Sequence, residues 1–167
     1  MGGVAISAAI FAIWYNHVKT HRVNSCWGPD AIHLLIHAPH VELLELGDVF
    51  NTPVDENIRT DKGKVQILTR TSISHAKGLT HLRHALRQDV SYCWDTSVIK
   101  NPNWSHGMRF IDGDQQLTLV FDLQIGALQT VESRITLQLN EKMVGGVETY
   151  FQELSVNVST GLPPNES

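Results

Sequence analysis

The sequence contains no run of lysine or arginine residues. It has 13 basic and 17 acidic residues, which give a formal net charge of −4 at pH 7. A protein that binds nucleic acid usually presents a basic face, because contacts to phosphates supply much of the affinity. The charge pattern therefore predicts no nucleic-acid partner.

Cysteine is scarce: Cys26 and Cys93 are the only two, and no C-x-x-C motif occurs. Two cysteines do not make a disulfide framework, and the closely spaced pairs that bind structural zinc are missing. The sequence leaves open whether one bridge joins them. Two free thiols are the expected state.

Familiar catalytic motifs are also missing. The chain has no G-x-S-x-G nucleophile elbow, no H-E-x-x-H zinc motif and no glycine-rich loop between a strand and a helix. Ser105 and His106 are adjacent, but neighbouring residues of a strand point to opposite faces, so we expect them to be poorly placed to act together. The sequence thus predicts no catalytic residue, no metal site and no cofactor, and it favours a protein that is not an enzyme.

The composition is that of a globular protein. The chain has 167 residues, of which 42% are hydrophobic and 18% charged. A chain of roughly 150 residues buries about 68–70% of its unfolded surface, so no disulfide is needed to stabilise it. We find no internal repeat and expect one domain.

The N-terminal segment is almost wholly apolar. Residues 4–15 carry no charge and end in Trp14 and Tyr15, which suit a membrane interface. Lys19 and Arg22 follow directly. A spanning helix needs about 20 apolar residues, with a lower limit near 17, so this run is slightly short.

We nevertheless predict a single-pass membrane anchor with a basic flank over residues 1–22. Residues 1–18 would contact the membrane, and the basic flank would keep the domain on the cytoplasmic side. The alternative is an N-terminal helix buried in a cytoplasmic protein.

The most regular pattern surrounds the dipeptide Gly113-Asp114. Apolar and polar residues alternate on both sides of it, which predicts two strands joined by a two-residue hairpin turn with glycine first. This register places Phe110 opposite Leu117 and Met108 opposite Leu119. The alternation resumes after the hairpin and continues over residues 131–139, so we predict a three-stranded meander.

Periodicity predicts the other elements. Alternating residues predict strands over residues 31–38, 41–46, 65–73 and 90–94, with a loop over 47–64. Helical spacing predicts a helix over residues 77–88, with Arg83 on its outer face. A second helix follows an N-cap at Asn140 and buries a stripe formed by Met143, Val147, Tyr150, Phe151 and Leu154.

These elements predict an α+β fold: a mostly antiparallel sheet of six or seven strands with two helices packed on one face, preceded by the apolar helix. We expect residues 23–30 to be a linker, residues 31–155 to be the single α+β domain and residues 156–167 to be a flexible tail.

Nine histidines are unusual for this length. On a strand, His33 and His37 would stand roughly 13 Å apart, too far to share a metal ion. His81 and His84 lie three apart on a helix and can share a face. The candidate ligand-binding residues are His33, His37, His81, His84, His106 and the loop residue Trp104.

Two functions follow from these patterns. The first is a small membrane-tethered, non-catalytic α+β domain that acts through protein–protein contacts or as an accessory subunit, with an unknown protein partner. The alternative is a soluble ligand-binding or hydrolytic domain with a His-lined pocket, with or without a bound metal ion.

Overall fold

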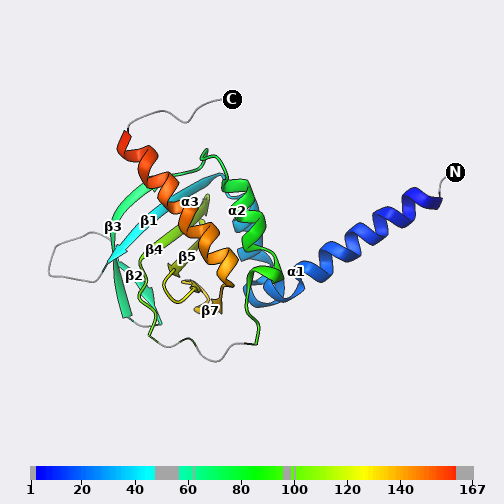
Figure 1. Ribbon diagram of the computed structural model, residues 1–167, viewed down its shortest axis with the longest axis horizontal. Coiled ribbons are helices and arrows are strands. Elements are labelled where there is room, and N and C mark those ends of the chain that lie inside the picture. The colour runs from blue at the N-terminus through cyan, green and yellow to red at the C-terminus, as the bar shows by residue number, and fades with distance from the viewer. Residues whose placement is uncertain (1–2, 48–56, 62, 96–98, 100, 161–167) are drawn as a thin grey trace.

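The computed structural model describes residues 3–47, 57–61, 63–95, 99 and 101–160. Within these ranges it describes side chains from Lys19 to Val156. Figure 1 shows a curved sheet with helices packed against it, while the first turns of the N-terminal helix run away from the sheet.

Within the described residues, seven strands form one sheet in the order β2-β3-β1-β4-β5-β6-β7, and all neighbouring strands are antiparallel. This confirms the predicted α+β class and the mostly antiparallel sheet. The strands are β1 (His40–Gly47), β2 (Asn57–Thr60), β3 (Gly63–Ser72), β4 (His106–Asp112), β5 (Gln115–Asp122), β6 (Ala127–Thr130) and β7 (Ile135–Gln138).

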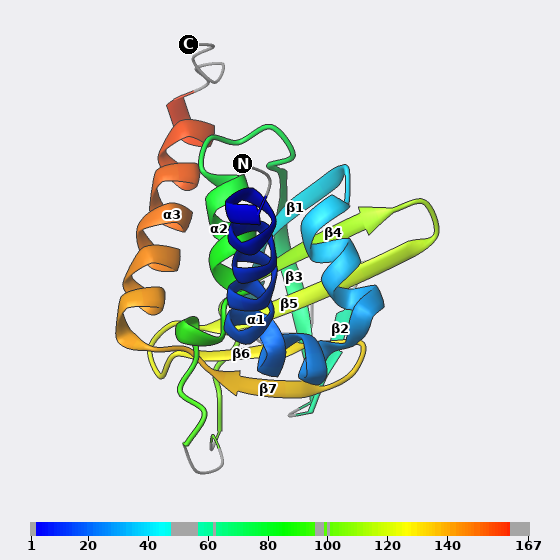
Figure 2. The same ribbon diagram turned by 90° about the vertical axis from the view of Figure 1, so that its right-hand side faces the viewer.

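Three α-helices are present in the same ranges: α1 (Gly3–His37), α2 (Leu79–Leu86) and α3 (Glu141–Thr160). A short 3-10 helix, η1 (Asp89–Ser91), follows α2. Side chains from all three α-helices join one main core with the inward residues of the sheet. Figure 2 shows the last turns of α1 lying over β4 and β5, which this helix contacts.

The predicted hairpin register is confirmed. Phe110 pairs with Leu117 and Met108 with Leu119, and all four side chains are buried. Gly113 takes a positive φ of 58° at the first turn position, a conformation that glycine adopts without steric cost. The strand expected next is instead a second hairpin, because β6 turns back into β7, so the meander has four strands.

The helix after Asn140 is also confirmed. The Asn140 side-chain oxygen accepts a hydrogen bond from the amide of Met143 at 2.7 Å, as an N-cap residue does. All five residues of the predicted stripe are buried. The helix runs on to Thr160, so residues 156–160 are not the tail that we expected, and residues 161–167 lie outside the described part.

The strand predicted over residues 31–38 is wrong, because these residues form the end of α1. An alternation over eight residues fits a strand, and such a strand would place Leu35 on the same outer face as His33 and His37, but Leu35 is fully buried. In the helix, Leu34, Leu35 and Ala38 share the buried side.

The linker expected over residues 23–30 is also helical. Val23 and Trp27 are buried in the main core, so this stretch packs against the domain and is not a linker. The helix changes direction at Gly28, whose φ of 81° is non-helical, and at Pro29, which cannot donate a helical hydrogen bond.

Two further segments differ from expectation. Residues 90–94 form no strand: they contain the end of η1 and a single bridge between Tyr92 and Leu139, and Val90 is 69% exposed. The loop expected over residues 47–64 contains β2, while residues 48–56 and 62 lie outside the described part.

Candidate functional site

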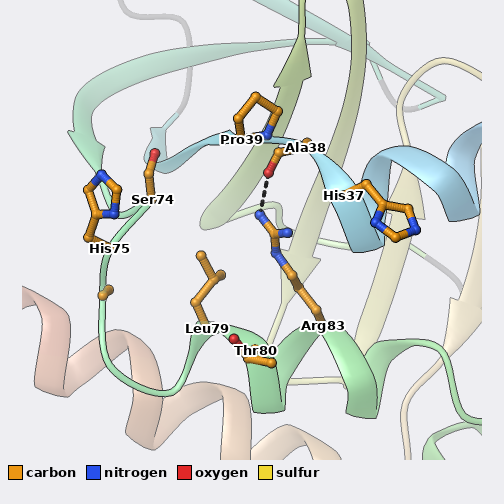
Figure 3. Close-up of a pocket in the computed structure, with 9 residues that line it drawn as sticks. His37, Ala38, Pro39, Ser74, His75, Leu79, Thr80 and Arg83 are labelled. Atoms are coloured by element: carbon orange, nitrogen blue, oxygen red, sulfur yellow. Dashed lines mark hydrogen bonds between the residues drawn. The ribbon is translucent and has the colours of Figure 1, made fainter.

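A cavity of about 400 Å³ lies where the end of α1, the loop before α2 and the first turns of α2 meet. Figure 3 shows the lining side chains, with Arg83 between His37 on one side and Ser74 and His75 on the other. The lining residues are His37, Ala38, Pro39, Ser74, His75, Ala76, Leu79, Thr80 and Arg83. No carboxylate is among these residues, and three of them carry basic side chains.

Arg83 connects the two helices that border the cavity. Its Nη1 donates a hydrogen bond to the carbonyl oxygen of Ile36 at 2.6 Å, and its Nη2 donates to that of Ala38 at 2.7 Å. Carbonyl groups at a helix C-terminus lack helical partners and carry partial negative charge, so the guanidinium caps α1. The prediction that Arg83 lies on an outer face is therefore wrong.

Arg83 is also partly removed from water. Its guanidinium carbon lies 5.6 Å from the centre of the Phe110 ring. Burial lowers the pKa of Arg83 from its ordinary value, and the nearby Tyr150 acts in the opposite direction. The same burial effect raises the pKa of Tyr150 to about 12.

His33 and His37 lie much closer together than the strand prediction implied. Their ring centres are 4.8 Å apart, because residues four apart on a helix occupy the same face. Both side chains are exposed, and His37 lines the cavity. His33 is the neighbour of the cavity residue and is not itself in the lining.

His81 and His84 are exposed on α2 and do not line the cavity. One ring nitrogen of His84 lies 2.6 Å from Nε2 of Gln88. The structure therefore pairs His33 with His37 but does not bring all four predicted histidines to one pocket.

His106 begins β4 and is half-buried. Its ring stacks on Phe151 with centres 5.2 Å apart. Desolvation lowers the pKa of His106, and the charge of Glu45, its partner across the sheet, acts in the opposite direction. The neutral imidazole is therefore favoured.

Ser105 and His106 do contact each other, contrary to our expectation. The Ser105 hydroxyl oxygen lies 2.9 Å from Nδ1 of His106. The parity rule fails because Ser105 precedes the first residue of β4 and is not part of the strand. The Ser105 amide and carbonyl are bonded to the backbone of Phe121 and Leu46, which fixes this turn of the chain.

Trp104 is not an exposed contact residue. It is 3% exposed and covers the second face of the sheet, the face opposite the three helices. Its apolar neighbours there come from five strands: Leu44, Leu46, Ile58, Ile67, Val120 and Ala127. The sheet curls around this face, which brings the amide of Asp61, in the β2–β3 turn, within 3.5 Å of Oε1 of Gln129 on β6.

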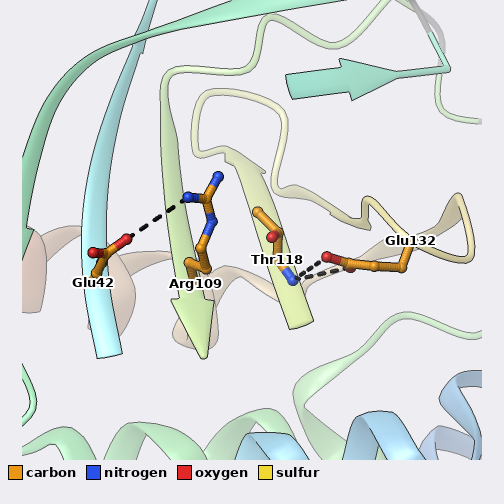
Figure 4. A network of polar contacts seen from close by, with 4 residues as sticks. All are labelled: Glu42, Arg109, Thr118 and Glu132. Carbon is orange, nitrogen blue, oxygen red and sulfur yellow. Dashed lines mark hydrogen bonds and ion pairs between the residues drawn. The ribbon is translucent and has the colours of Figure 1, made fainter. Parts of the chain in front are cut away.

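Polar contacts that involve the buried residues Arg109 and Thr118 accompany this second cluster (Figure 4). Nη1 of Arg109 lies 3.8 Å from a carboxylate oxygen of Glu42 on the neighbouring strand. Both carboxylate oxygens of Glu132 lie 2.9 Å from the amide of Thr118 and accept from it. These contacts join neighbouring segments of the sheet, so we interpret them as structural.

In the described part of the chain, no group of three histidine, cysteine or acidic side chains is arranged to hold a metal ion. As expected, Cys26 and Cys93 are not joined by a disulfide bond. Among the residues that the structure describes, no helix is both long and apolar enough to cross a membrane. Residues 1–18, predicted to contact the membrane, lie outside the part whose side chains are described.

Sequence reasoning missed Ser74, His75 and Arg83 as cavity residues. One signal was available for Arg83, which follows the buried Leu79 by four positions and so lies at the edge of the apolar stripe of α2. Ser74 and His75 lie in a loop, where no periodic pattern indicates direction.

Comparison with known proteins gives no relative: no family model, no curated protein and no solved structure matches this chain.

Proposed function

We propose that this protein is a membrane-tethered, non-catalytic α+β domain that acts through protein–protein contacts, as an accessory subunit. The observation that carries the proposal is the uncharged apolar segment of residues 4–15, which belongs to the same helix that buries Val23 and Trp27. The basic residues Lys19 and Arg22 lie between these two parts. Their position favours a domain on the cytoplasmic side.

Contacts of Arg22 and Val23 fix the helix to the folded domain just after the apolar segment. The amides of Arg22 and Val23 donate to the Asp89 carboxylate at 3.0 and 2.9 Å. The Arg22 guanidinium lies 5.7 Å from the centre of the Trp94 ring. A helix anchored in this way holds a domain in a set orientation at the bilayer, whereas a flexible linker would leave it free to rotate.

Fractionation of cells tests the tether. We compare the full chain with a variant that lacks residues 1–18 and with the double variant Ile10→Lys, Ile13→Lys. The deletion stops before Lys19, so that the contacts of Arg22 are kept. The matched control is Ile10→Leu, Ile13→Leu, which keeps the segment apolar.

We expect the full chain and the leucine control to stay in the membrane pellet after alkaline carbonate washing. The deletion and the lysine variant should move to the supernatant, because a charge at the centre of a bilayer costs about 2.5–3.5 kcal/mol or more. A full chain found in the supernatant would refute the tether.

The mass of the detergent-purified complex tests the interaction half of the proposal. An accessory subunit should purify with a second protein in fixed ratio. A monodisperse particle with the mass of one chain and its detergent would argue against it.

A second candidate function is the binding of a small ligand in the cavity lined by His37 and His75. The cavity volume of about 400 Å³ supports it, because ligand sites commonly measure about 300–1,000 Å³. We propose binding without a metal ion, since the lining residues offer only two imidazoles as ligands.

A further inference from the structure

The lining of the cavity between α1 and α2 is one-sided in charge. His37, His75 and Arg83 are basic, Ser74 and Thr80 supply hydroxyl groups, and no lining residue is acidic. The chain as a whole has a net charge of −4, so this is a local reversal of sign. Anions are drawn to such a concave basic site because the surrounding protein focuses its field.

The charge of Arg83 is not neutralised within the protein. In the ranges that the structure describes, no carboxylate forms an ion pair with Arg83, and its Nε is buried without a hydrogen-bond partner. Its two carbonyl contacts use one hydrogen on each terminal nitrogen, so further donors remain. A partly desolvated cation gains most from an anionic partner with which it can form hydrogen bonds.

We propose that this cavity binds a small oxyanion, a carboxylate or a phosphate group. The proposal rests on the ligand-binding candidate above and adds its ligand class. Arg83 supplies the fixed charge, and His37 and His75 flank it from opposite sides (Figure 3). Ser74 Oγ accepts from the amide of Val41 at 2.9 Å, which leaves its hydroxyl hydrogen for the anion. Leu79 offers an apolar wall for a short carbon chain.

Titrations of the full chain in detergent micelles test the proposal. Three probes are compared at constant ionic strength: inorganic phosphate, butanoate and the uncharged butanamide. The readout is the change in NMR shift of the His37 and His75 rings and of the Arg83 Nε–H, with calorimetry for affinity. Phosphate and butanoate separate the two possible sources of the oxyanion.

The test variant is His75→Ala, and the matched control is His81→Ala, which removes an exposed histidine that does not line the cavity. Arg83 is left intact because it caps α1. We expect saturable shifts with at least one anion and no binding of butanamide. Anion binding should be about tenfold weaker in His75→Ala, because this variant loses one charge-assisted hydrogen bond to the anion. The control should bind as the parent does.

Each other outcome decides a specific point. Butanamide binding as tightly as butanoate at the same residues would overturn the oxyanion assignment and leave ligand binding in place. No saturable shift with any probe would overturn both. Equal loss of affinity in the two histidine variants would show that the anion is attracted by general charge and not by this cavity.

Discussion

Asp89 offers the sharpest test of how the chain is held together. It begins η1, yet its carboxylate accepts hydrogen bonds from the amides of Arg22 and Val23, 67 and 66 residues earlier. In the middle of an α-helix these amides would bond to carbonyls four residues back. Asp89 thus ties the middle of α1 to η1, and we predict that Asp89→Ala destabilises the fold.

The expected cost is about 1–2 kcal/mol. The comparable loss of a side chain that accepts from helix amides, at an N-cap, costs about 0.5–2 kcal/mol. The Val23 amide is partly buried and loses its partner, while the exposed Arg22 amide can bond to water, so the sum stays within this range. The Asp89 carbonyl still accepts from Trp94 Nε1 at 2.7 Å, because that contact uses the main chain. Asp89→Asn keeps one side-chain acceptor and should cost less.

Urea unfolding of the full chain, followed by tryptophan fluorescence, measures the change. Trp27 and Trp94 lie near the altered contact and report on it. We expect a lower midpoint with an unchanged slope, since the same surface is exposed on unfolding. The control is Asp95→Ala, an exposed aspartate nearby, which should change stability by less than about 0.5 kcal/mol. If Asp89→Ala costs no more than this control, the stabilising role of the Asp89 carboxylate is refuted.

Two further predictions concern buried side chains. The Tyr92 hydroxyl donates to the carbonyl of Leu86 at 2.5 Å, whereas the buried Tyr150 hydroxyl has no partner among the described residues. Urea midpoints should therefore show a loss of about 1 kcal/mol for Tyr92→Phe and no loss for Tyr150→Phe; equal losses would contradict this. Folding lowers the pKa of His106 from its ordinary value of about 6.5. As the pH falls below about 6.5, the unfolded chain therefore binds more protons than the folded chain, so the stability of the fold should decrease. His106→Phe should reduce this slope in urea midpoints measured from pH 5 to 8, and an unchanged slope would refute the assignment.

The sequence was a good guide where neighbours along the chain decide the structure. The hairpin register followed from the turn at Gly113-Asp114 together with the alternation of Met108 and Phe110. The helix after Asn140 followed from its cap and its apolar stripe. In both cases the interacting residues lie within a few positions of one another, so local pattern and turn chemistry are sufficient.

The sequence misled where a short apolar pattern fits two periods. The alternation over residues 31–38 agrees with a strand, but the burial of Leu35 against the sheet selects a helix. That choice depends on partners far away in the chain, which periodicity does not contain. The error carried over to His33 and His37, whose separation depends on whether the backbone is extended or helical.

By itself, the sequence determined the antiparallel α+β class, the central hairpin and the last helix, because each depends on contacts between near neighbours. Only the tertiary structure decided that the Asp89 carboxylate accepts from two amides in the middle of α1, that Arg83 caps the C-terminal end of this helix, and that His37, His75 and Arg83 line one cavity. The physical reason is the same in all three cases. Polar groups of helices and loops pair with whichever side chain the folded chain brings near, and sequence distance does not limit that choice.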